Sequence, residues 1–128
     1  MNRRFGQLGC IGLGTMGEAM CPGLKKKSGL ELIAYDRDPA SLARSHAHRV
    51  RSGNSVADAS KQSDVVFVSL PSGEVVEEFV CQPGGLLECA IRGQIVIDLG
   101  TSPVDLTRRL AAALAAVGAT LVDVPVAA

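Results

Sequence analysis

The sequence predicts an α/β protein with a doubly wound parallel sheet and helices on both of its faces. Two observations carry this prediction. Strand-like apolar runs alternate with helix-like segments along all 128 residues, and this alternation favours parallel strands joined by right-handed crossovers. The strongest run, residues 65–70, is apolar at nearly every position, as is typical of a strand covered on both faces. The length is that of one domain.

Each element follows from periodicity and from the residues that end it. Strands are predicted over residues 7–11, 30–35, 48–51, 65–70, 94–99 and 119–124. Helices are predicted over residues 15–28, 39–45, 55–62, 74–80 and 103–117. Gly29 ends the first helix, and Pro22 inside it removes one hydrogen bond and predicts a kink. Pro39 opens the second helix, with Asp38 as its N-cap.

Charge and composition exclude several classes of function. Lys and Arg number 13, as do Asp and Glu, so the formal net charge is zero and no basic field is expected to recruit nucleic acid or a membrane surface. No apolar run approaches the roughly 18 residues that a membrane span needs. The four cysteines form no C-x-x-C pair and share no metal-ligand spacing with the histidines, so no metal site is expected. The expected compartment is the reducing cytoplasm.

A glycine-rich segment joins the first predicted strand to the first helix and fits the pattern G-x-G-x-x-G. It runs Gly12-Leu13-Gly14-Thr15-Met16-Gly17. The first glycine permits a tight turn, the second lets the backbone approach a pyrophosphate, and the third lets the helix pack closely on the strand. The amides of Leu13, Thr15 and Met16, with the helix dipole, can then hold the pyrophosphate.

An acid follows the second strand at the distance that dinucleotide binding requires. Asp36 lies 19 residues after Gly17 and can accept hydrogen bonds from both adenosine ribose hydroxyls. The competing interpretation, a glycine turn beside a capping aspartate, does not explain why strand, loop, helix and acid are all in register. The pattern therefore predicts a Rossmann-type domain over residues 1–128, with strand order 3-2-1-4-5-6. Asp36 favours NAD, whereas Arg37 can pair with a 2′-phosphate or stack on adenine, so NADP stays possible.

Four segments, in order along the chain, resemble motifs of the β-hydroxyacid dehydrogenases, the 3-hydroxyisobutyrate and 6-phosphogluconate dehydrogenase type. They are I-G-L-G-T-M-G at residues 11–17, V-S-L-P at 68–71, D-L-G-T-S-P at 98–103 and V-D-V-P-V at 122–126. The resemblance implies that Leu70 and Pro71 lie beside the cofactor, with Val75 nearby on the next helix. It also implies that Thr101 reaches the nicotinamide side.

The resemblance implies an oxidoreductase that transfers a hydride between NAD, or NADP, and a small 3-hydroxy acid. In the family, a lysine on a long helix after this domain is the general acid/base, with an asparagine one turn later. The last lysine of this chain is Lys61, so we expect no catalytic residue here and no efficient turnover by this portion alone. The family's all-helical C-terminal domain, which builds the dimer, is absent, and the full-length enzyme is expected to be a homo-oligomer.

The end of the chain departs from the family pattern. The family has serine and glycine after the valine of its substrate motif, whereas this chain has Ala127 and Ala128. Alanine offers no hydroxyl to a substrate carboxylate, so two alternatives stay open. One is an imine-reductase-like enzyme, whose substrates need no carboxylate site, and the other is a non-catalytic dinucleotide-binding module.

Overall fold

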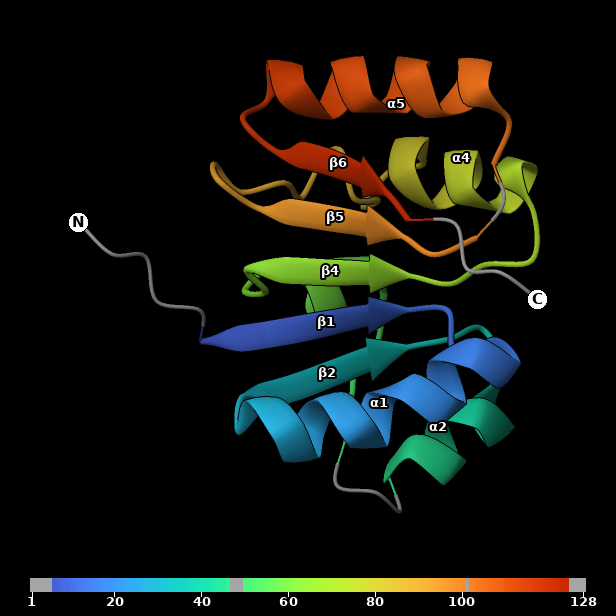
Figure 1. Cartoon of the computed structure of the whole chain (residues 1–128), viewed down its shortest axis with the longest axis vertical. Helices are drawn as coiled ribbons and strands as arrows, with labels where there is room; N and C mark the ends of the chain where they lie inside the picture. Colours follow the sequence, from blue (N-terminus) through green and yellow to red (C-terminus); the bar gives the residue numbers. More distant parts are fainter. Residues whose placement is uncertain (1–5, 47–49, 101, 125–128) are drawn as a thin grey trace.

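The computed structural model describes residues 6–46, 50–100 and 102–124, and Figure 1 shows the arrangement of their elements. Six parallel strands form one sheet in the order β3-β2-β1-β4-β5-β6. The strands are β1 (Gln7–Ile11), β2 (Glu31–Tyr35), β3 (Arg51–Ser52), β4 (Val65–Val68), β5 (Ile95–Asp98) and β6 (Thr120–Asp123). The helices are α1 (Gly14–Ser28), α2 (Pro39–His46), α3 (Val56–Ser60), α4 (Gly73–Cys81) and α5 (Val104–Ala116). The predicted fold class and strand order are confirmed.

Two apolar cores lie on opposite faces of this sheet. Neighbouring residues of β1 point to different cores: Cys10 packs with residues of α1 and α2, and Ile11 packs with residues of α3, α4 and α5. Both side chains are almost fully buried. Burial on both faces explains why the strands are apolar at successive positions and do not alternate with polar residues.

The strand order reverses between β1 and β4. From β1 the chain moves outward to β3, and it then returns across the sheet to β4 on the other side of β1. The carboxyl ends of β1, β2 and β4 are level, because Ile11 is in register with both Tyr35 and Val68. In open α/β sheets, ligands bind in the crevice at such a switch point.

One half of a sheet face carries less cover than the other. α1 and α2 lie over the β1 and β2 side, whereas no helix of the described residues lies over β4 and β5 on that face (Figure 1). Phe67, Ile95 and Ile97 are therefore only partly buried there. Val122 and Val124, at the edge strand, are 39% and 42% exposed.

The predicted helix ends are confirmed where the sequence marked them. Gly29 adopts a left-handed conformation with φ of 68° after α1, and its amide donates to the carbonyl of Lys25. Asp38 caps α2 by accepting a 3.0 Å hydrogen bond from the amide of Ala40. Pro22 lies inside α1, which is continuous from Gly14 to Ser28.

The largest differences from the predicted strand boundaries are at β3 and β4, whereas β2, β5 and β6 are shorter than predicted by one residue at one or both ends. β3 comprises only Arg51 and Ser52, which pair with Ile33 and Ala34, while residues 48 and 49 of the predicted strand lie outside the described part of the chain. β4 ends at Val68 and not at residue 70, because the chain leaves the sheet there for the start of α4. In the described ranges, no helix is long and apolar enough to cross a membrane.

Candidate functional site

The glycine turn at the end of β1 is packed tightly against the end of β4. Gly12 has a φ of 79°, in the left-handed region that favours glycine. A Cβ atom at this position would lie 2.3 Å from the carbonyl oxygen of Ser69 and 2.5 Å from Cδ2 of Leu70. No side chain fits there, so the first glycine of the motif is required by geometry as well as by backbone conformation.

Asp36, at the end of β2, braces this turn. One carboxylate oxygen accepts a 2.6 Å hydrogen bond from the amide of Leu13, and the other accepts a 2.8 Å hydrogen bond from the amide of Asp38. The amide of Leu13, one of those predicted to hold a pyrophosphate, thus donates to Asp36 in this structure, and Leu13 is itself fully buried. Each carboxylate oxygen has capacity for a further hydrogen bond, so Asp36 can brace the turn and still accept from a hydroxyl.

α1 begins directly after the turn, with Leu13 at its N-cap position and Gly14 as its first residue. The described contacts include no side-chain cap at this end, and the first turn contains no acidic residue. The first amides of a helix have no partner within the helix and carry the positive end of its dipole. This end of α1 therefore suits an anion, with backbone donors at the switch point of the sheet.

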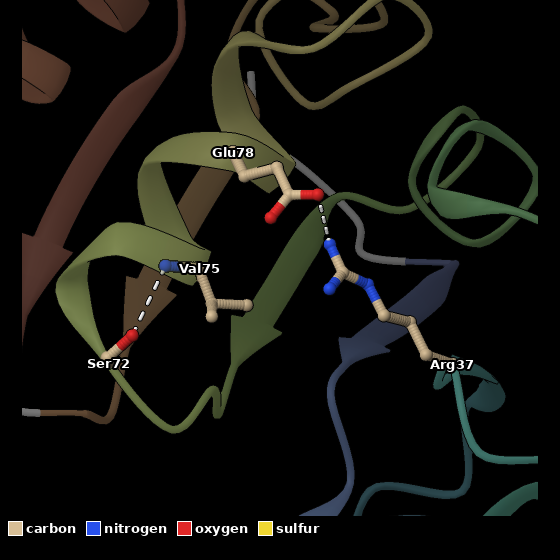
Figure 2. A network of polar contacts seen from close by, with 4 residues as sticks. All are labelled: Arg37, Ser72, Val75 and Glu78. Carbon is tan, nitrogen blue, oxygen red and sulfur yellow. Dashed lines mark hydrogen bonds and ion pairs between the residues drawn. The ribbon is translucent and has the colours of Figure 1, made fainter.

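Arg37 reaches from the end of β2 to α4, as Figure 2 shows. Its Nη2 atom lies 2.5 Å from Oε1 of Glu78, and its guanidinium carbon lies 4.5 Å from the centre of the Phe79 ring. Phe79 is buried and also contacts the ring of Tyr35. Sequence reasoning missed Glu78 and Phe79, because 41 residues separate Glu78 from Arg37 and no local pattern links them.

The segment after β4 carries three further predicted residues. Leu70 is half-buried and packs against the core beside the glycine turn, whereas Pro71 is exposed. Ser72 caps α4 by accepting a 3.3 Å hydrogen bond from the amide of Val75. Figure 2 shows the side chains of Val75 and Glu78, one turn apart, on the side of α4 that faces Arg37.

The loop after β5 is organised by a buried acid. Asp98 is 2% exposed; one of its carboxylate oxygens accepts from the amide of Gly100 and the other from the hydroxyl of Ser102, each at 2.9 Å. Thr101, predicted to reach the nicotinamide side, lies outside the described residues. Asp98 belongs to a motif that the sequence analysis recognised, but nothing in the sequence indicated that it holds the loop.

A pair of buried cysteines lies between β1 and α1, close to the turn. The Sγ atoms of Cys10 and Cys21 are 3.0 Å apart, and both residues are almost fully buried. The hydrogen bond with Cys21 and burial raise the pKa of the Cys10 thiol well above its ordinary value. Cys10 therefore stays a neutral thiol at physiological pH and packs as a small hydrophobe.

The described part of the chain contains no group of three or more His, Cys, Asp or Glu residues that suits a metal ion. An open hollow of 390 Å³ lies between the starts of α4 and α5, where Arg109 pairs with Glu77 at 2.9 Å. None of the residues predicted to bind a cofactor lines this hollow.

A glycine turn that opens a helix at the switch point of a doubly wound sheet, with an acid on the neighbouring strand, defines the dinucleotide-binding Rossmann domains. Within this class, the family described as the NAD binding domain of 6-phosphogluconate dehydrogenase matches residues 7–128. The chain belongs to that family.

Curated relatives include dehydrogenases of hydroxy acids. The chain is 32% identical over 120 residues to 2-(hydroxymethyl)glutarate dehydrogenase of Eubacterium barkeri, covering 94% of this chain and 40% of that enzyme. It is 31% identical over 116 residues to 3-hydroxyisobutyrate dehydrogenase of Pseudomonas aeruginosa, covering 91% and 39%. The chain thus spans about 40% of the length of these relatives.

Several solved structures superimpose on this chain. 3-Hydroxyisobutyrate dehydrogenase of Mycobacterium tuberculosis, with L-serine, superimposes with a TM-score of 0.88 at 29% identity over 98% of this chain and 42% of its own. Psf3 in complex with NADP⁺ superimposes with a TM-score of 0.84 at 30% identity, covering 94% and 43%. An imine reductase variant from Myxococcus stipitatus with NAD⁺ shares the fold, at a TM-score of 0.81 and 21% identity over 94% and 40%.

Proposed function

We propose that this chain binds NAD at the glycine turn and is the cofactor domain of an oxidoreductase acting on small 3-hydroxy acids. The observation that carries the proposal is the 2.6 Å hydrogen bond from the amide of Leu13 to Asp36. This bond fixes the turn at the end of β1 to the acid at the end of β2. The two parts of the predicted dinucleotide motif thus form one connected unit.

The proposed site assigns each part of the dinucleotide to a region of the chain. The backbone of residues 12–17 and the start of α1 hold the pyrophosphate, because helix amides and the helix dipole favour an anion there. Asp36 accepts the adenosine ribose hydroxyls, and Arg37 borders the adenine side. Leu70, Pro71, Val75 and Thr101 border the nicotinamide half.

When bound, the nicotinamide supplies the hydride chemistry, and the residues of this chain bind it, orient it and exclude water from one side. Leu70 and Val75 are suited to that role because both are half-buried apolar residues in the segment that follows β4. Proton transfer is assigned to residues outside this domain, by resemblance to the dehydrogenase family. The two-domain organisation of the enzyme is part of the same proposal.

The substrate class rests on the curated relatives, which are named for hydroxymethylglutarate and 3-hydroxyisobutyrate. Both named substrates are small acids with a hydroxyl on the carbon next but one to the carboxyl group. The imine reductase shares only the fold at 21% identity, so it gives less support to its own substrate class. The resemblance also supports a homo-oligomeric enzyme, and the cysteine pattern supports a cytoplasmic one; sedimentation and cell fractionation of the intact protein would test these two proposals.

The test of the substrate class is an assay of the protein that carries this domain. Short 3-hydroxy acids, 3-hydroxyisobutyrate among them, are offered with NAD⁺, and formation of reduced nicotinamide is followed by its absorbance. We expect reduction of NAD⁺ with at least one of these acids and no reduction with their analogues that lack the hydroxyl. No reduction with any 3-hydroxy acid, together with reduction of cyclic imines by NADH or NADPH, would contradict the proposal.

A further inference from the structure

The contact between Arg37 and α4 bears on which dinucleotide the site prefers. We propose that Glu78 is a specificity-determining residue, which holds Arg37 against Phe79 and thereby favours NAD over NADP. This inference rests on the proposed dinucleotide site. It assigns to Glu78 a role that follows from the structure and from no sequence motif.

Arg37 occupies the position from which a side chain can reach the adenosine 2′ substituent. It directly follows Asp36, whose carboxylate is assigned to the ribose hydroxyls. An arginine in this position is suited to a 2′-phosphate, because its planar guanidinium pairs with phosphate oxygens through two donors at once. An unrestrained Arg37 would therefore favour NADP.

In this structure the Arg37 guanidinium contacts two residues of α4. The guanidinium donates to Glu78 across 2.5 Å and lies over the Phe79 ring at 4.5 Å, as Figure 2 shows for the ion pair. Phe79 is 2% exposed and packs beside Tyr35, so the ring cannot follow a moving guanidinium. A 2′-phosphate would therefore compete with Glu78 and this ring for the guanidinium.

The negative charge near Arg37 also favours NAD over NADP. Arg37 is flanked along the chain by Asp36 and Asp38 and pairs with Glu78, so this cluster carries three carboxylates and one guanidinium. A 2′-phosphate would add further negative charge to this cluster, whereas a 2′-hydroxyl adds none. Removal of the Glu78 carboxylate both frees Arg37 and weakens the repulsion of the phosphate.

The expected effect is modest because the pair is half-exposed, at 51% for each side chain. Water and salt screen such an ion pair, and breaking it shifts an equilibrium by up to about fivefold. We therefore expect E78Q to tighten NADP⁺ binding by about fivefold at low salt, and to change NAD⁺ binding by less than about twofold. The gain for NADP⁺ should shrink as the ionic strength rises.

The experiment is calorimetric titration of the wild-type chain and its variants with NAD⁺ and with NADP⁺. E77Q is the matched control, because it removes the same charge from the neighbouring residue of α4, whose partner is Arg109. R37Q and the double variant R37Q/E78Q test whether the effect passes through Arg37. E78A is titrated as well, because glutamine can keep a neutral hydrogen bond to Arg37.

The proposal predicts a gain in NADP⁺ affinity for E78Q or E78A, no gain for E77Q, and a smaller gain from E78Q when Arg37 is already replaced. An unchanged ratio of NADP⁺ to NAD⁺ affinity in both Glu78 variants would overturn it. An equal gain in E77Q, or the same gain in the R37Q background, would overturn it too, because the effect would then come from net charge alone. A wild-type chain that binds neither dinucleotide would refute the proposed function itself, and the inference with it.

Discussion

Replacement of Gly12 by alanine is expected to destabilise the fold and to weaken dinucleotide binding together. The added methyl group would overlap the carbonyl oxygen of Ser69 and the side chain of Leu70, at 2.3 and 2.5 Å. The Ser69 backbone cannot move away freely, because its amide donates a 2.9 Å hydrogen bond to the carbonyl of Ile11. The turn and the end of β4 must therefore separate.

The size of the effect follows from two costs. A left-handed backbone conformation such as φ of 79° costs an alanine about 1–2 kcal/mol relative to glycine. Overpacking of a tight site adds about 1–3 kcal/mol. Gly12→Ala should therefore lower the free energy of unfolding by about 2–5 kcal/mol, a large fraction of the total for a domain of this size.

Urea unfolding followed by far-ultraviolet circular dichroism measures this loss, since the chain contains no tryptophan. Gly23→Ala is the control: Gly23 lies on the exposed side of α1 and an added Cβ would meet nothing within 4 Å. Alanine there should stabilise the fold by about 0.5–1 kcal/mol, because glycine is a poor helix former. A loss below about 1 kcal/mol for Gly12→Ala would refute the packing described for the turn.

Three further predictions concern the brace, the core and the thiols. Asp36→Ala removes both hydrogen bonds of the brace and the proposed ribose acceptor, and should weaken NAD binding by at least about tenfold in calorimetric titration; unchanged affinity would contradict the site. Gln94→Ala removes a buried amide that donates to two carbonyls at 2.9 Å and should cost about 2–4 kcal/mol in urea unfolding; a change within 0.5 kcal/mol, typical of surface substitutions, would contradict it. Iodoacetamide should label exposed Cys81 in the folded protein, but Cys10 and Cys21 only after unfolding. Cys10 and Cys21 are buried, and the pKa of Cys10 is raised. Mass spectrometry that finds Cys10 labelled as fast as Cys81 would contradict this prediction.

The glycine turn and the strand order could be predicted because their signals are local. A strand, three glycines and an acid at a fixed spacing indicate one backbone arrangement, and the left-handed Gly12 and the position of Asp36 confirm it. The bounds of β3 are less predictable, because two residues give no periodicity. They depend on pairing with Ile33 and Ala34.

The contacts within the site depend on tertiary structure and could not be read from the sequence. The motif assigns the Leu13 amide to a pyrophosphate, whereas in this structure the amide donates to Asp36. The Arg37–Glu78 pair joins the end of β2 to α4 across 41 residues of chain, and only the fold brings the two together. The sequence shows Asp98 only as one residue of a family motif. Its burial and its two contacts to the loop come from the tertiary structure.

The proposed site places the pyrophosphate of NAD at the turn that follows β1. Nuclear magnetic resonance of the isotope-labelled chain, titrated with NAD⁺, tests this placement because every backbone amide reports separately. We expect saturable, one-site shifts that are largest for the amides of residues 12–17 and for those beside Asp36. No saturable shift, or shifts confined to the hollow between α4 and α5 around Glu77 and Arg109, would contradict it.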